Sequence, residues 1–134
     1  MHDSQINELP KFFAEMQDLG VDAFIIGDVG AISIAKEYAP NVAIHVSTQA
    51  SVANTYAAIQ YAKLGVKRIV LAREMSLDEI AELRKNLDSK GYDDLELEAF
   101  VHGAMCMSIS GRCLISSYLT GRSANQGACT QPCR

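Results

Sequence analysis

Residues 66–101 read VKRIVLAREMSLDEIAELRKNLDSKGYDDLELEAFV, with two apolar runs on either side of a helical segment. The runs at 68–72 and 95–101 predict strands because they are short and apolar. Between them, Ser76 and Glu79 form the pattern of a capping box, in which the serine hydroxyl and the glutamate carboxylate each accept from the other residue's amide. A glycine follows the last helical turn, as at many helix ends. The stretch therefore predicts a strand–helix–strand unit.

The same alternation extends toward the N-terminus. Apolar residues at helical spacing and short apolar runs predict further elements: helices at 7–19, 31–38 and 52–64, and strands at 23–26 and 42–46. Short apolar strands separated by helices are typical of parallel strands buried on both faces. We therefore expect an α/β fold built from parallel (β/α) units of a TIM-type barrel, and a doubly wound sheet is the alternative.

The number of units predicts a partial barrel. A complete barrel needs eight units and about 250 residues, whereas this chain of 134 residues holds about four and begins on a helix. We expect a fragment, or a half that self-assembles: a partial barrel over 1–103, and a cysteine-rich segment over 104–134 packed on its rim. The remainder of the barrel or a second copy would cover the two open sheet edges.

Composition limits the cellular compartment and the binding partners that we expect. Twelve Lys and Arg residues against sixteen Asp and Glu give a net charge of -4, which excludes a dominant cationic surface. No apolar run reaches the length of about 18 residues that a membrane span needs, and the N-terminus lacks the pattern of a signal peptide. We expect a cytoplasmic protein. In a reducing compartment, cysteines are metal ligands or catalytic thiols more often than disulfides.

All four cysteines fall in the last 29 residues, in the pattern Cys-x6-Cys-x15-Cys-x3-Cys: Cys106, Cys113, Cys129 and Cys133. Their polar and glycine-rich neighbours suit a loop that folds around a metal and donates amides to thiolate sulfurs. Four thiolates complete the ligand set of Zn²⁺ or of an iron–sulfur cluster. The spacing lacks the Cys-x2-Cys pairs of a zinc ribbon, which favours the cluster over zinc. Two disulfides or unliganded thiols are the alternatives.

Polar residues follow the predicted strands and would meet at one rim of a barrel, where barrel enzymes carry their reactive groups. They are Asp28, His45 with Ser47 and Gln49, Arg73 with Glu74, and His102. We take His45, Arg73, Glu74 and His102 as candidate catalytic or substrate-binding residues. The alternatives are a core histidine at 45, an ion pair between the residues at 73 and 74, and a hydrogen bond from the histidine at 102 that orients the cysteine loop.

Other residues bear on the choice of substrate. Arg112, Arg122 and Arg134 could contact RNA phosphates, or could offset the charge of a thiolate-bound cluster, which the acidic composition favours. Peptidase motifs such as His-Glu-x-x-His or Gly-x-Ser-x-Gly do not occur. A nucleophilic pair of Cys106 with His102 conflicts with a metal role, because a cysteine bound to a metal is not free to attack.

The segment EAFVHGAMCMSISGRCLISSYLTGRSANQGACTQPCR at 98–134 resembles peptidase family U32, the collagenase-like protease family, and so do 20–23, 45–49 and 71–74 upstream. The resemblance implies a barrel whose four cysteines hold a 4Fe–4S cluster. The family carries a peptidase label, yet several branches hydroxylate RNA bases or assist hydroxylation of the quinone ring. The stretch GRSANQGACTQPCR looks most like the branch that forms 5-hydroxyuridine in transfer RNA, using prephenate.

Three functions follow from these observations. The first is an iron–sulfur enzyme that hydroxylates uridine in transfer RNA, with prephenate as a possible co-substrate. The second is a peptidase that acts on proteins or peptides, as the family label says. The third is a non-catalytic accessory protein in which the four cysteines form a structural metal site.

Overall fold

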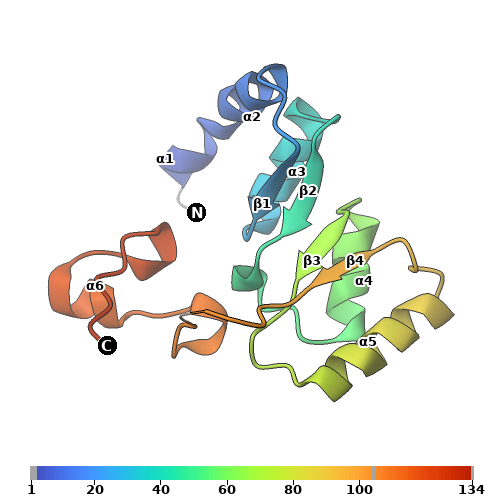
Figure 1. The fold of residues 1–134 in the computed structure, drawn as a ribbon. Helices are drawn as coiled ribbons and strands as arrows, with labels where there is room; N and C mark the ends of the chain where they lie inside the picture. The colour runs from blue at the N-terminus through green and yellow to red at the C-terminus, as the bar shows by residue number, and fades with distance from the viewer. Residues whose placement is uncertain (1–2, 104, 134) are drawn as a thin grey trace.

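The computed structural model describes residues 3–103 and 105–133, and it is an α/β fold around one parallel sheet (Figure 1). The four strands are β1 (Ala23–Ile26), β2 (Ala43–Val46), β3 (Arg68–Val70) and β4 (Glu96–Glu98). They lie in the order β1-β2-β3-β4, so that each strand pairs with the strand before it in the chain. Every predicted strand is present, although β4 is shorter than the expected 95–101.

Helices precede and separate these strands: α1 (Asp3–Ile6), α2 (Leu9–Asp18), α3 (Val29–Tyr38), α4 (Thr55–Lys63) and α5 (Leu77–Ser89). The cysteine-rich segment adds α6 (Ile115–Thr120). Short 3-10 helices occur at η1 (Thr48–Ala50), η2 (Ile109–Gly111) and η3 (Ala124–Gln126). Two expectations were wrong in detail. The separate turn α1 was not expected, and α4 begins at Thr55, later than residue 52, because Asn54 caps it there.

Side-chain caps set the starts of the three helices that follow strands. Asp28 accepts hydrogen bonds from two amides in the first turn of α3, at 2.8 and 3.1 Å, and Asn54 accepts one at the start of α4, at 2.9 Å. Ser76 and Glu79 form the predicted capping box at α5, which is confirmed. Each cap satisfies backbone donors that have no partner within the helix, so it fixes the residue at which the helix begins.

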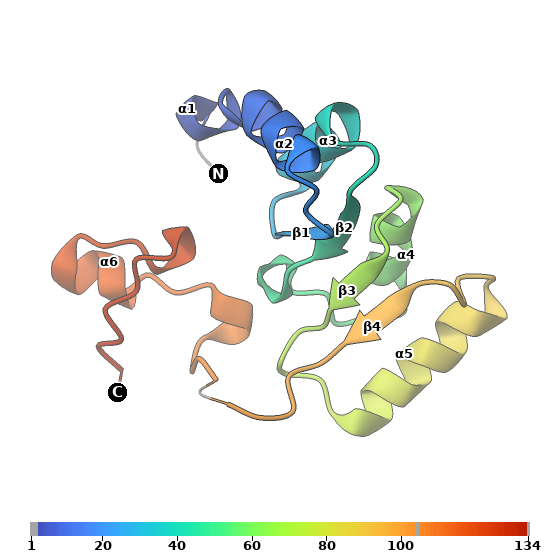
Figure 2. The ribbon, with the colours of Figure 1, turned by 45° about the horizontal axis from the view of Figure 1, so that its top comes forward.

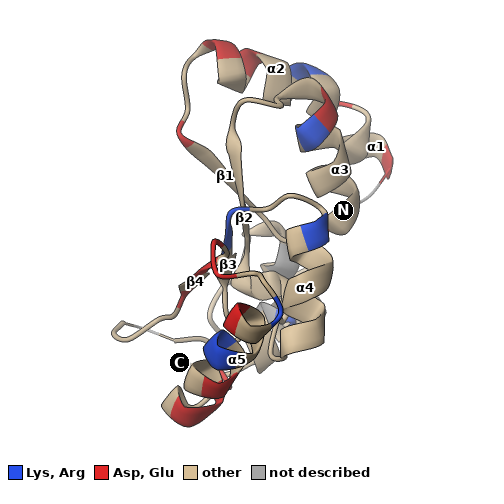
Figure 3. Ribbon diagram, turned by 90° about the vertical axis from the view of Figure 1, so that its right-hand side faces the viewer, with Lys and Arg blue, Asp and Glu red and all other residues tan. Residues whose placement is uncertain are grey.

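The helices pack against one face of the sheet, as the end-on view shows for α3 and α4 (Figure 3). Register places one row of apolar side chains on this face: Ile26, Val46, Ile69 and Leu97. Together with apolar residues from α2 to α5 they form a single core. Burial of this face is the main favourable contribution to folding.

The opposite face of the sheet is open. The adjacent row in the register is Ile25, His45, Arg68 and Glu96. Ile25 is 65% exposed, and the Arg68 guanidinium contacts Glu96 at 2.6 Å and Glu98 at 3.3 Å. A doubly wound sheet would carry helices on this face too. Sequential strands with helices on one face are instead compatible with partial barrel units.

In the view of Figure 3, acidic and basic residues both occur along the helices. Within the described ranges, no helix is long and apolar enough to cross a membrane.

Candidate metal centre

A pocket of about 340 Å³ lies where the cysteine-rich segment passes the carboxyl ends of the strands. All four predicted ligands line it: Cys106, Cys113, Cys129 and Cys133. The strand side of the pocket is formed by Thr48 and Gln49 of η1 and by Arg73, which follows β3. Figures 1 and 2 show the segment leaving β4 and passing η1, with α6 beyond it. The fold therefore brings together thiols that are up to 27 residues apart, since 133 − 106 = 27.

The cysteine loops donate amides to the sulfur atoms, as the sequence predicts. The Sγ atoms of three cysteines each accept from the amide two residues later, at 3.3 to 3.4 Å: Cys106 from Ser108, Cys113 from Ile115, and Cys129 from Gln131. Hydrogen bonds to cysteine sulfur are one of the means by which proteins tune iron–sulfur clusters.

The four cysteines carry free thiols. None of the four cysteines forms a disulfide. In the part of the chain that the structure describes, no three His, Cys, Asp or Glu residues are close enough to hold a single metal ion.

Glu74 connects the cysteine-rich segment to the sheet by two hydrogen bonds. Its carboxylate accepts from the amide of Ser110 at 2.6 Å and from the hydroxyl of Ser110 at 2.7 Å. The hydroxyl of Ser110 contributes most to holding the pKa of Glu74 below its ordinary value, and the Ser110 amide and the charge of Arg73 add to it against the opposing effect of burial. In the described chain, Arg73 and Glu74 do not form an ion pair with each other.

Arg73 faces the cysteine pocket. Its Nε atom is buried and, among the described residues, has no hydrogen-bond partner. A guanidinium beside four thiols can balance their negative charge or bind the carboxylate of a small molecule. Of the four candidate catalytic residues, Arg73 alone lines the pocket, and Glu74 adjoins it through Ser110.

The structure does not bring the two candidate histidines to this pocket. His45 lies within β2 rather than beyond its end, on the open face between Ile25 and Arg68. His102 is exposed in the connection that follows β4. Neither residue lines the pocket. Asp28 is engaged as the cap of α3.

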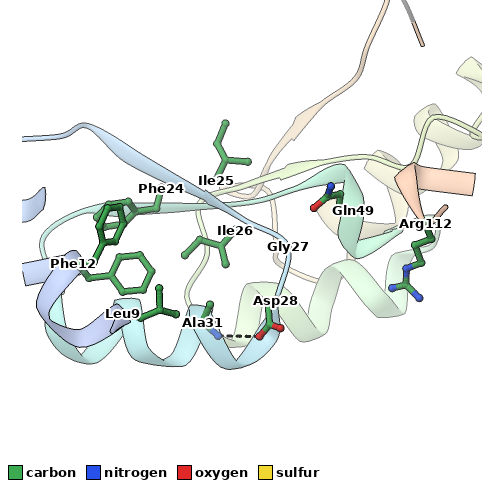
Figure 4. A pocket seen from close by; sticks show the side chains of 11 residues that line it. Leu9, Phe12, Phe24, Ile25, Ile26, Gly27, Asp28, Ala31, Gln49 and Arg112 are labelled. Atoms are coloured by element: carbon green, nitrogen blue, oxygen red, sulfur yellow. Dashed lines mark hydrogen bonds between the residues drawn. The ribbon is translucent and has the colours of Figure 1, made fainter. Parts of the chain in front are cut away.

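Arg112 and Arg122 of the segment differ in their surroundings. Arg112 lines a second pocket, of about 610 Å³, at the edge of β1 (Figure 4). Figure 4 shows Ile25 and Phe24 on opposite sides of that strand, and Gln49 lines both pockets. Arg122 is exposed, and Arg134 lies outside the described residues.

Sequence reasoning missed two serines of the site. Ser110 and Ser116 are fully buried although both lie in a polar segment. The Ser116 hydroxyl is 3.1 Å from the Thr130 hydroxyl and accepts from the Thr130 amide at 3.1 Å. Their partners are 36 and 14 residues away, so no local pattern could have revealed the contacts.

Comparison with known proteins identifies relatives. The model of peptidase family U32 matches residues 1–134. The tRNA hydroxylation protein P of Helicobacter pylori is 49% identical over 131 residues, which are 98% of this chain and 30% of that protein. An uncharacterized protease of Methanocaldococcus jannaschii is 51% identical over 114 residues, 85% of this chain and 27% of that protein. The 23S rRNA 5-hydroxycytidine C2501 synthase of Escherichia coli is 36% identical over 134 residues, 100% of this chain and 19% of that protein.

The chain thus spans less than a third of the length of these relatives. No solved structure matches it.

Proposed function

The chain belongs to peptidase family U32, and on that premise we propose that it is part of an iron–sulfur enzyme that hydroxylates uridine in transfer RNA. The observation that carries the proposal is the pocket lined by all four cysteines, with amides directed at three of the sulfurs. The names of the relatives support RNA as the substrate, because a tRNA hydroxylation protein and an rRNA hydroxycytidine synthase are among them.

Four cysteines would hold a 4Fe–4S cluster, and the bound cluster would supply one-electron chemistry. The residues of this chain would arrange what surrounds it. Arg73, with its buried Nε unpartnered among the described residues, would bind the carboxylate of a co-substrate such as prephenate. Gln49, which lines this pocket and the neighbouring one, would lie between the co-substrate and a base placed beyond it.

RNA would be held by local contacts and not by the overall charge. The chain has a net charge of -4, so phosphate binding would depend on single arginines such as Arg112 and Arg122, and on the rest of a longer protein. His45, on the open face of the sheet, would act only after that face is enclosed.

We further propose that these units belong to a TIM-type barrel, and the open edges of the sheet support this. β1 and β4 are the two edge strands, and unpaired edges invite further strands. The pocket beside β1, lined by Leu9, Phe12 and Phe24, lies where a preceding strand would pair. The remainder of the barrel or a second copy would cover it. A monodisperse, cooperatively unfolding monomer in ultracentrifugation would contradict this arrangement.

Anaerobic purification followed by iron, sulfide and zinc analysis tests the cluster. We expect about four irons and four sulfides per chain, with a brown colour. Cys129→Ser should lose most of the iron, whereas Met107→Leu, an exposed apolar residue next to Cys106, should retain it. One zinc without iron would overturn the cluster and move the peptidase and the accessory protein with a structural metal site ahead.

A second experiment tests the reaction. Expression in bacteria that lack 5-hydroxyuridine, followed by mass spectrometry of digested transfer RNA, should show the modified nucleoside with the wild type and not with Arg73→Met. The peptidase alternative is favoured by the family label and by the protease name of the archaeal relative. Peptide cleavage by the same preparation, with no change in transfer RNA, would establish that alternative instead.

A further inference from the structure

Among the residues that the structure describes, the buried polar residues are Ser110 and Ser116, each 0% exposed. Buried polar groups are stable only when they are hydrogen-bonded, so their partners report what holds the segment together. Ser110 bonds to Glu74, which follows β3. Ser116 bonds to Thr130, within the segment. One serine therefore joins the cysteine-rich segment to the sheet, and the other joins two parts of the segment to each other.

The contact between Glu74 and Ser110 has a specific geometry. Both carboxylate oxygens are used, one by the amide of Ser110 at 2.6 Å and one by its hydroxyl at 2.7 Å. Ser110 has φ 41° and ψ 35°, a left-handed conformation that is uncommon for residues other than glycine. Such conformations persist where the surrounding structure over-determines them, and they cluster at functional sites.

The position of the contact in the chain gives it a consequence for the site. Glu74 comes directly after Arg73, which lines the cysteine pocket. Ser110 lies in the loop between Cys106 and Cys113, and η2, which contains it, contacts η1 on the strand side of the pocket. We propose that Glu74 is a positioning residue: it docks the loop of the first two cysteines on the sheet and so holds the thiols beside Arg73.

The two serines then have separate roles. The Glu74–Ser110 contact docks the segment, whereas the Ser116–Thr130 contact keeps the part near Cys113 together with the part near Cys129. Docking of the segment by Glu74 depends only on residues of this chain. The effect of docking on a metal centre rests on the proposed function. The docking role and the proposed function can therefore fail separately.

Hydrogen–deuterium exchange on the metal-free protein tests docking directly. In Glu74→Ala, exchange at the Ser110 amide should rise about 10- to 100-fold, the range expected when a hydrogen bond to a charged acceptor is lost, while the Thr130 amide is unchanged. In Ser116→Ala the Thr130 amide should exchange faster and the Ser110 amide should not. Unchanged exchange at Ser110 in Glu74→Ala would overturn the proposal.

Two milder variants keep the test decisive if Glu74→Ala does not fold. Ser110→Ala removes the hydroxyl bond and keeps the amide bond, and Glu74→Gln keeps one acceptor oxygen for two donors. We expect each to raise exchange at the Ser110 amide by less than Glu74→Ala does. If both leave that amide, and the neighbouring loop amides, at wild-type rates, the contact does not dock the segment.

The metal-bound protein provides a second readout that activity alone would not give. Glu74→Gln should bind the same iron as the wild type but lose it to a chelator several-fold faster, with a changed electron paramagnetic resonance spectrum after reduction. Wild-type rates and spectrum would overturn the positioning role. If the wild type binds no iron, the proposed function fails, and the exchange experiment still decides whether Glu74 docks the segment.

Discussion

Ser76, two residues after Glu74, is the N-cap of α5. Replacing it by alanine removes half of the capping box that starts this helix. The Ser76 hydroxyl accepts from the Glu79 amide at 3.3 Å and donates to the Glu79 carboxylate at 2.8 Å, while the Ser76 amide donates to that carboxylate at 2.7 Å. The variant loses the two hydroxyl bonds and keeps the third. Loss of a serine cap lowers the free energy of unfolding by about 1 kcal/mol.

Urea unfolding followed by circular dichroism measures this change. With a slope of about 2 kcal/mol per M, the midpoint should fall by about 0.5 M. Ser89→Ala is the matched control, because Ser89 lies at the other end of α5 and bonds only locally, to the Asn86 carbonyl. Alanine at this helical position should be neutral or slightly stabilising. Equal effects of the two substitutions would refute the role assigned to the cap.

The pH dependence of the same variant gives an independent check. The amide of Ser76, and then its hydroxyl, hold the pKa of Glu79 below its ordinary value. A lowered pKa in the folded state means that the stabilisation is complete above the unfolded value of about 4.3 and disappears as pH falls through the folded value. The difference between wild type and Ser76→Ala should therefore be smaller at pH 3 than at pH 7. An increase at low pH would contradict the geometry.

Three further substitutions or conditions test other parts of the structure. Leu87→Ala, at a fully buried position of α5, should lower the free energy of unfolding by about 2 to 5 kcal/mol, and urea unfolding would show a loss below 1 kcal/mol if the core were misplaced. Arg68→Met should leave the urea midpoint nearly unchanged, because its ion pairs are solvent-exposed; a clear fall in the midpoint would mean that the open face is covered. Since the pKa of Glu74 is lowered, its contact with Ser110 should hold above about pH 4.3 and weaken as pH falls through the folded pKa. Exchange at the Ser110 amide, corrected for intrinsic rates, should then rise toward pH 3, and a flat profile would exclude the contact.

The local elements of this chain were predictable because their causes are local. A cap acts within three residues, a terminal glycine acts on the preceding turn, and apolar periodicity records which face of an element is buried. These signals predicted the four strands and the capping box of Ser76 and Glu79, all confirmed. They misplaced the start of α4, which was expected at residue 52 and begins at Thr55 after the Asn54 cap.

The sequence alone also identified the four cysteines as a group, because thiols crowded into a polar, glycine-rich segment are unsuited to a core. It did not determine which strand-end residues would join them. His45, His102 and Arg73 were equivalent candidates on the pattern, and only the register and the path of the chain placed Arg73 at the pocket. The contact of Glu74 with Ser110 spans 36 residues. Contacts of that kind depend on how separate elements pack, and packing is settled by the tertiary structure.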